Sequence, residues 1–178
     1  MIAPLNGRLL AAWYNCSENE IVGRTVIRGR WSDDGGQTWS APEIICEDEQ
    51  EHRHMVPVTF SEQNGEVWAY VTKMSAHDRP MGYVCARCEA DGWRIREERS
   101  DLVLLNTLPQ QTQGNWIVGG RMAKSIGELP LIPIVATAAP ASPAQWTIQP
   151  LPGPWDDGEY PFQYPETALL TDGARVDA

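Results

Sequence analysis

The chain of 178 residues carries a formal net charge of −10, because 24 acidic side chains outnumber 14 basic ones. A nucleic-acid partner is therefore not expected, since phosphate binding needs a basic surface that displaces counterions. The hydrophobic share of 42 % is that of a globular protein with a packed core. Fifteen glycines and 14 prolines interrupt the sequence throughout, which leaves little room for long helices.

No segment is predicted to span a membrane. The most apolar stretch, residues 129–141, contains Pro130, Pro133 and Pro140, and it is shorter than the roughly 20 residues of a spanning helix. The N-terminus has no basic flank before an apolar run, so it is not typical of a secretory signal. A cytoplasmic location is slightly favoured over secretion.

Four cysteines are too few to scaffold a chain of this length through disulfides. Cys85 and Cys88 form a C-x-x-C pair, but they lie in an expected strand, where positions three apart point to opposite faces. No second C-x-x-C pair completes a zinc site. We therefore expect unpaired thiols, no metal and no other cofactor.

Turn signals and tryptophans recur along the chain as two series with a shared spacing. The turn dipeptides that precede apolar segments are Asn6-Gly7, Asn64-Gly65, Gly114-Asn115 and Asp172-Gly173. Trp39, Trp93 and Trp146 each follow a turn-rich stretch, and they lie 54 and 53 residues apart. A common period of about 54 residues predicts a structural repeat.

Each repeat has the pattern of four short strands joined by turns. In the second repeat the expected strands are Met55–Ser61, Glu66–Thr72, Gly82–Cys88 and Trp93–Glu98. A repeated four-stranded antiparallel unit is typical of a β-propeller blade, so the sequence predicts an all-β fold, a partial β-propeller. The single domain 1–178 is expected to divide into blades at 1–50, 51–101 and 102–155, with the start of another at 156–178.

One complete motif lies within the first repeat. Residues 32–39 follow the pattern S-x-D-x-G-x-T-W, with motif positions Ser32, Asp34, Gly36, Thr38 and Trp39. An Asp carboxylate in such a turn accepts backbone N–H groups, and glycine permits positive φ. The motif resembles that of the Asp-box (bacterial neuraminidase repeat) families, above all the sialidases and sialidase-like glycoside hydrolases. This resemblance implies a propeller with six blades when complete, in which the boxes are structural pins away from the active site.

The connectivity of a four-stranded meander places the candidate functional residues at one end of the blades. The first and last turns of each blade share one end with the box, while the longer loops and the links between blades share the other. Function usually lies on such longer segments, which here are residues 15–24, 47–54, 74–81, 102–110 and 123–130. The candidate side chains at that end are Glu18, Glu20, Arg24, Arg53, His54, Lys73, His77, Asp78, Arg79, Arg121 and Glu166.

The resemblance implies a retaining hydrolysis of sialosides, with an arginine triad for the substrate carboxylate, a tyrosine nucleophile assisted by a glutamate, and an aspartate as acid/base. Glu166 matches the family's inner-strand glutamate, and Glu20 offers a carboxyl group in the loop expected to hold the acid/base. Tyr14 and Asn15 stand where the family has its second arginine. The resulting assignment is catalytic for Glu166 and Glu20, and substrate-binding for Arg121, Arg53, His54, Lys73 and Asp78. The simpler alternatives are solvated acids in the loop around Glu20 and a surface ion pair for Arg53.

Three functions follow from these observations. The first is a sialidase-like glycoside hydrolase that is exo-acting on sialic acid or a related terminal sugar. The second is a non-catalytic Asp-box propeller that binds glycans or proteins, since a fold does not determine a function. The third is a hydrolase of a non-sialic sugar, which needs no arginine at Tyr14.

The expected partner is therefore a carbohydrate in the first and third cases, and a glycan or a protein in the second. Propellers close with typically 4–8 blades, whereas 178 residues provide about three. We expect an incomplete propeller whose missing blades come from the rest of the chain or from another copy.

Overall fold

The computed structural model describes residues 2–19, 23–48, 54–76, 79–126, 131–153, 170–171 and 176–177. All regular elements within these ranges are β-strands in antiparallel sheets, which confirms the predicted all-β fold. No helix in that part of the chain is long and apolar enough to cross a membrane.

Three sheets follow one another along the chain, and we call them blades 1 to 3. Blade 1 has the strand order β1 (Ile2–Leu5), β2 (Arg8–Cys16), β3 (Thr25–Ser32) and β4 (Glu43–Glu47). Blade 2 has the order β5 (His54–Gln63), β6 (Glu66–Ala76), β7 (Arg79–Glu89) and β8 (Gly92–Arg99). Blade 3 has the order β10 (Gln110–Thr112), β11 (Asn115–Met122), β12 (Ile132–Ala138) and β13 (Thr147–Pro150), with β9 (Val103–Leu105) also paired to β11. A short pair, β14 (Leu170–Thr171) and β15 (Val176–Asp177), comes last.

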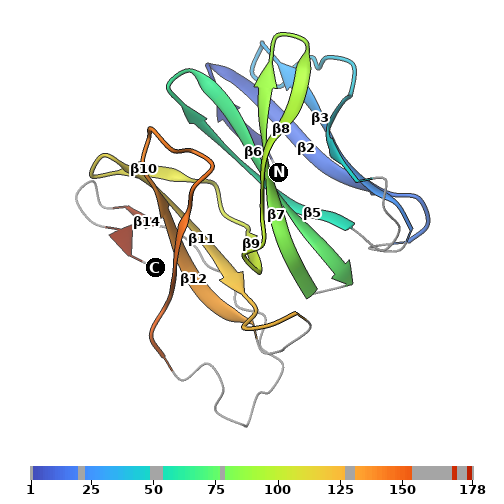
Figure 1. The fold of residues 1–178 in the computed structure, drawn as a ribbon. Coiled ribbons are helices and arrows are strands. Elements are labelled where there is room, and N and C mark those ends of the chain that lie inside the picture. Colours follow the sequence, from blue (N-terminus) through green and yellow to red (C-terminus); the bar gives the residue numbers. More distant parts are fainter. Residues whose placement is uncertain are drawn as a thin grey trace.

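Blade 2 lies between blade 1 and blade 3 (Figure 1), and its side chains alternate between two apolar clusters. In β6, Val67, Ala69 and Val71 belong to the cluster shared with blade 1, whereas Trp68 and Tyr70 belong to the cluster shared with blade 3. Successive side chains of a strand point to opposite faces, so a nearly continuous apolar run buries both faces of one sheet. The core of the molecule therefore consists of the two layers between the blades.

The C-x-x-C pair of β7 is divided between these two clusters. Cys85 belongs to the cluster between blades 2 and 3, while Cys88 packs against the cluster between blades 1 and 2. The predicted opposite orientation of the two side chains is confirmed. All four cysteines are free thiols.

Two of the recurring tryptophans pack between successive blades. Trp93 of blade 2 packs on Phe60 with ring centroids 6.0 Å apart, and its indole N–H donates to Glu43 of blade 1 over 3.0 Å. Trp146, next to β13 of blade 3, makes an edge-to-face contact with Tyr70 of blade 2 at 5.2 Å. A tryptophan that follows the last turn of each of these blades thus packs onto the preceding blade.

The turns between the first two strands of each blade lie at one end, as predicted. Asn6 and Asn64 adopt φ of 51° and 54° ahead of their glycines, as a type I′ turn requires. The backbone N–H of Asn6 donates to the Glu62 carboxylate, and the side-chain amide of Asn64 donates to the carbonyl of Pro140 over 3.1 Å. Neighbouring blades are therefore joined by hydrogen bonds at this turn end.

Two details of blade 3 differ from the prediction. Its first turn is Gln113-Gly114, with φ of 47° and 80°, one residue before the predicted pair Gly114-Asn115. The segment 102–110 was expected to be a link between blades, but it contains strand β9. The hydroxyl of Thr107 accepts the N–H of Gly119 over 2.8 Å, which replaces a backbone partner where β9 and β10 are interrupted. The turn Asp172-Gly173 lies outside the described residues.

Candidate functional site

The Asp box is a closed network of hydrogen bonds between β3 and β4. The Ser32 hydroxyl donates to Asp34 Oδ1 and accepts the Gly36 N–H, each over 2.8 Å. Thr38 donates both its backbone N–H, to Oδ1 at 2.8 Å, and its hydroxyl, to Oδ2 at 2.6 Å. The indole N–H of Trp39 closes the turn on the Gly36 carbonyl at 3.1 Å. Every motif position is used in holding the turn together.

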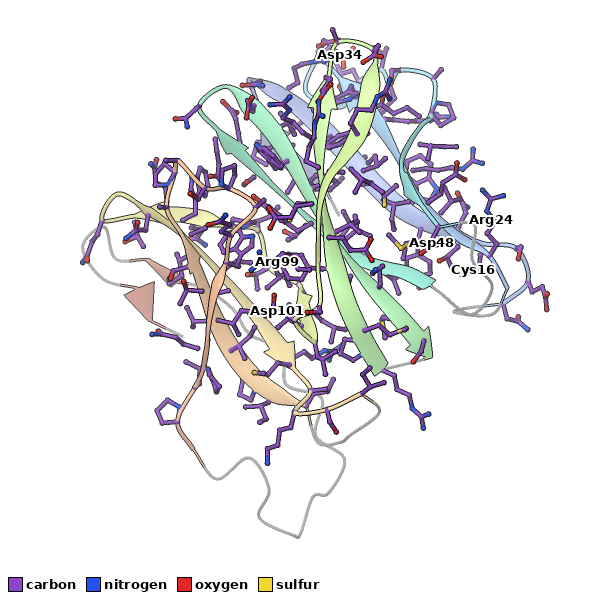
Figure 2. The ribbon with its side chains drawn as sticks, viewed as in Figure 1. Cys16, Arg24, Asp34, Asp48, Arg99 and Asp101 are labelled. Carbon is purple, nitrogen blue, oxygen red and sulfur yellow. The ribbon has the colours of Figure 1, made fainter. Side chains whose placement is uncertain are left out.

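These donors define the electrostatics of Asp34. The side-chain hydrogen bond from Thr38 is the largest cause, followed by the Thr38 N–H and the Ser32 hydroxyl, and together they lower the pKa of Asp34 to about 2. Hydrogen bonds to a carboxylate favour its ionised form. Asp34 lies at the opposite end of blade 1 from Cys16, Arg24 and Asp48 (Figure 2). We call the end of the blades that carries Cys16, Arg24 and Asp48 the loop end. The position of the box at the other end fits a structural role.

At the loop end of blade 1, two hydrogen bonds between Ser17 and Arg24 join the end of β2 to the start of β3. The N–H of Ser17 donates to the carbonyl of Arg24, and the N–H of Arg24 donates to the hydroxyl of Ser17, both over 2.9 Å. The guanidinium of Arg24 forms an ion pair with Glu47 of β4. This cation is thus neutralised within its own blade. Glu18 is exposed in the same turn.

Lys73 lies in the layer between blades 1 and 2 rather than on an open surface. It is only 7 % exposed, and its ammonium group forms an ion pair with Glu98 of β8. Nearby Cys46 is buried, and burial is the main cause that raises the pKa of its thiol to about 12. Lys73 is thus a buried and paired cation, and its assignment to substrate binding stays a prediction.

Arg121 lies near the end of β11, the second strand of its blade path, as the sequence predicts. Its backbone is in register with Leu104 of β9 and Pro133 of β12. Val118 packs toward blade 2, so the alternation of side chains places Arg121 on the opposite face of blade 3. Lys73 therefore lies on the blade 1 side of blade 2 and Arg121 on the far face of blade 3, and their assignment to one substrate site stays a prediction.

Several predicted site residues lie outside the part of the chain that the structure describes. These are Glu20, Arg53, His77, Asp78 and Glu166. His54 begins β5, where its backbone is in register with Met74, and its side chain is likewise outside the description. Arg79 is exposed at the start of β7. The catalytic assignment of Glu20 and Glu166 therefore stays a prediction.

The position at which the resemblance expects an arginine is occupied by exposed side chains. Tyr14 is 40 % exposed near the end of β2, and Asn15 is exposed beside it. The amide oxygen of Asn15 accepts the indole N–H of Trp13 over 3.0 Å. No cationic side chain of β2 lies next to the loop at its end.

A hollow that sequence reasoning did not find opens between the first strands of the three blades. It has a volume of about 510 Å³, and residues that line it include Leu5, Ser61, Glu62, Gln110, Gln111 and Trp116. These residues adjoin the turns between first and second strands, so the hollow is at the opposite end from the predicted loop site. No motif marks them in the sequence, because they come together only when three repeats pack side by side.

The stacked four-stranded sheets and the box define a repeat-built propeller. Residues 7–116 match the family described as BNR repeat-like domain. The chain belongs to this family. No curated protein sequence matches the chain significantly.

Similarity to solved structures extends the comparison to more of the chain. An α-L-arabinanase from Cellvibrio cellulosa is similar with a TM-score of 0.50 and 10 % identity, over 78 % of this chain and 51 % of that one. A mutant of the Cellvibrio cellulosa enzyme gives a TM-score of 0.51 and 11 % identity, over 77 % of this chain and 50 % of the mutant's. At such low identity the likeness concerns the fold alone. The chain spans about half the length of these structures.

Proposed function

We propose that the chain is part of a carbohydrate-active propeller, a glycoside hydrolase whose substrate is a neutral sugar rather than a sialoside. The observation that carries this proposal is the exposed pair Tyr14 and Asn15 at the end of β2, where a sialidase is expected to present an arginine. A carboxylate-binding clamp depends on the bidentate geometry of a guanidinium. A tyrosine and an asparagine can contact hydroxyl groups but cannot neutralise a carboxylate.

Two of the candidate cations are already paired with carboxylates, which supports a neutral substrate. Arg24 is neutralised by Glu47, and Lys73 is neutralised by Glu98. Each ion pair would have to break before its cation could bind a sialic-acid carboxylate. The similarity of fold to α-L-arabinanases is in keeping with hydrolysis of a non-sialic sugar.

In this proposal two carboxyl groups share the chemistry, as in most glycoside hydrolases. Glu20, which lies between β2 and β3 in the sequence, donates a proton to the glycosidic oxygen as the bond to the sugar breaks. Glu166 acts as the second carboxylate, either as the nucleophile or as the base that activates water. Arg121, Arg53, His54 and Asp78 are the proposed contacts to sugar hydroxyls.

The test is hydrolysis by the protein of fluorogenic α-L-arabinofuranosides, other neutral glycosides and a sialoside. We expect turnover of a neutral glycoside and a loss of at least about 100-fold in kcat for Glu166→Gln, the usual size of an acid–base contribution. Asp91→Asn, in the exposed turn between β7 and β8, is the control and should keep full activity.

Other outcomes overturn the proposal in different ways. Turnover of the sialoside alone would contradict the neutral substrate. Glycan binding by a folded protein without any turnover would instead support a non-catalytic propeller.

A further inference from the structure

Open sheet edges surround the hollow between the first strands of the three blades. β1, β5 and β10 each stand at one end of the strand order of their described sheets, so one side of each main chain has no strand partner there. The residues that line the hollow come from these strands and from their neighbours in blades 1 to 3. We propose that the hollow is a binding site for a neutral saccharide, separate from the active site proposed at the loop end.

The main-chain edges supply polar groups for a ligand. An end strand presents N–H and C=O groups that its own sheet leaves unpaired. The blades of a propeller surround a central channel, so a further blade would lie beside the hollow in the ring and would not pair with these edges. An extended peptide is also unsuited to them, because Pro4 in β1 and Pro109 next to β10 interrupt the row of N–H donors that an added strand requires. A small hydroxylated ligand needs only single hydrogen bonds from such groups.

Half-buried apolar side chains form part of the wall. Trp116 packs against the cluster between blades 2 and 3 and stays partly exposed. Leu108 and Pro109 are likewise only half-buried at the hollow. An indole that is not fully covered by its own core can pack against the C–H groups of a sugar ring, since aromatic side chains offer a large apolar surface. The hollow therefore combines an apolar contact surface with polar edges.

The charges around the hollow favour a ligand without charge. Glu62 is the one charged side chain among the described residues that line it, and its carboxylate accepts the N–H of Asn6. Because this carboxylate already accepts a donor, we favour a neutral ligand over an organic cation. No described lysine, arginine or histidine lines the hollow, so an anionic sugar would find no cation there. Gln110 and Gln111 instead offer amides, which donate to and accept from sugar hydroxyl groups.

The volume and the position of the hollow agree with this assignment. The hollow measures about 510 Å³, within the range of roughly 300–1,000 Å³ that small-ligand sites occupy. It lies at the turn end of the blades, opposite to Tyr14 and Asn15 at the end of β2. A saccharide can occupy it whether or not the loop end hydrolyses glycosides, so the inference does not depend on the proposed function.

The test follows two side-chain signals in nuclear magnetic resonance spectra of the isotope-labelled protein. These are the indole N–H of Trp116 and the amide of Gln111, recorded during titration with arabinotriose, xylotriose and cellotriose. We expect at least one of these neutral saccharides to shift both signals, with a dissociation constant in the millimolar range or tighter. The indole N–H of Trp13, which donates to Asn15, detects binding at the loop end separately.

Two variants and a control locate the binding. Trp116→Ala, followed through the Gln111 signal, should weaken binding by about 10-fold through loss of the aromatic contact. Gln111→Ala, at an exposed position and followed through the Trp116 signal, should weaken it by about 3-fold, the size of one hydrogen bond. The control Trp13→Ala removes an exposed tryptophan away from the hollow and should leave the affinity unchanged. Thermal unfolding establishes that each variant is folded.

Four outcomes would overturn the inference. The first is no shift of the Trp116 and Gln111 signals at millimolar neutral saccharide, and the second is binding that both folded variants leave unchanged. The third is a shift with sialyllactose or with choline alone, which would assign the hollow to an anion or to a cation. The fourth is a shift of the Trp13 signal alone, which would place the saccharide at the loop end. Saccharide binding at the hollow by a protein that hydrolyses no glycoside would support the inference and contradict only the proposed hydrolase.

Discussion

At the scale of single residues, the fold lowers the pKa of the Asp34 carboxyl group through hydrogen bonds. Its pKa is lowered from 3.8 to about 2 in the folded protein. A group with a depressed folded pKa stabilises the fold above its unfolded pKa, and this contribution is lost as pH falls toward the folded value. We predict that the free energy of unfolding falls between pH 4 and pH 2, and that Asp34→Asn removes part of this fall.

The measurement is urea unfolding at pH 5 and at pH 2.5, with Thr38→Val as the matched variant. The Thr38 hydroxyl makes the largest contribution to the lowered pKa of Asp34, so its removal should reduce the same pH dependence. In the Asp34→Asn background, Thr38→Val should change the pH dependence no further. A pH dependence that Asp34→Asn leaves intact would show that another carboxylate is responsible.

The hydroxyl groups of two buried tyrosines in blade 2 differ in their hydrogen bonds. The hydroxyl of Tyr70 contacts Ser61 at 2.9 Å and Gln63 at 3.1 Å, and it donates to the carbonyl of Pro143 of the next blade over 2.9 Å. The hydroxyl of Tyr83 is buried and has no hydrogen-bond partner among the described residues. Removal of one partner from a satisfied buried network costs about 1–3 kcal/mol.

We therefore predict opposite behaviour for the two Tyr→Phe variants. Tyr70→Phe should lower the free energy of unfolding by about 1–3 kcal/mol, whereas Tyr83→Phe should change it by less than about 0.5 kcal/mol or raise it. Chemical denaturation monitored by tryptophan fluorescence measures both. An equal loss in the two variants would mean that aromatic packing, rather than the network around Tyr70, determines the cost.

At the scale of the strands, one glycine allows β7 and β8 to approach each other closely. Gly82 has a φ of +147°, and a Cβ there would lie 2.2 Å from the carbonyl oxygen of Arg99. We predict that Gly82→Ala lowers the free energy of unfolding by about 3 kcal/mol through strain and displacement of the strand. Gly65, with φ of +77° and nothing near its missing Cβ, is the matched control.

Gly65→Ala should cost only about 1 kcal/mol, because it adds a side chain to a left-handed residue in open space. Urea unfolding of the two variants provides the comparison. If the two substitutions cost the same, the close contact with Arg99 contributes nothing beyond backbone conformation.

The sequence predicts the elements best where local chemistry determines them. Asn6-Gly7 and Asn64-Gly65 carry their own turn preference, and both turns lie where the sequence indicates. Gln113 has no such preference, and it adopts a positive φ in the turn that joins β10 to β11. The sequence therefore does not mark this turn. The interruption between β9 and β10 was equally hidden, since it depends on a contact between Thr107 and Gly119 that the two strands create only when they pair.

The candidate site is harder to predict because it depends on relations between blades. Repeat spacing located the loop end, but it could not show that Lys73 is buried against Glu98 of its own blade. Nor could it place Arg121 on the far face of blade 3. The burial of each side chain depends on which neighbouring sheet covers its face of the strand. That neighbour is set by the packing of the blades and not by the local sequence.

At the scale of the whole molecule, blade 2 is the common wall of both apolar layers. Cys46 is buried in the layer between blades 1 and 2, and Cys85 is buried in the layer between blades 2 and 3. Burial raises the pKa of each thiol to about 12, so neither forms the reactive thiolate in the folded protein near pH 8.

We predict that both thiols become reactive over one and the same range of urea concentration. Because β6 and β7 contribute side chains to both layers, unfolding of blade 2 exposes both layers at once, and we expect the described blades to unfold as one cooperative unit. Pulsed alkylation followed by mass spectrometry of peptides that contain Cys46 and Cys85 measures the two midpoints separately. Two distinct midpoints would show instead that an outer blade detaches while the other stays packed on blade 2.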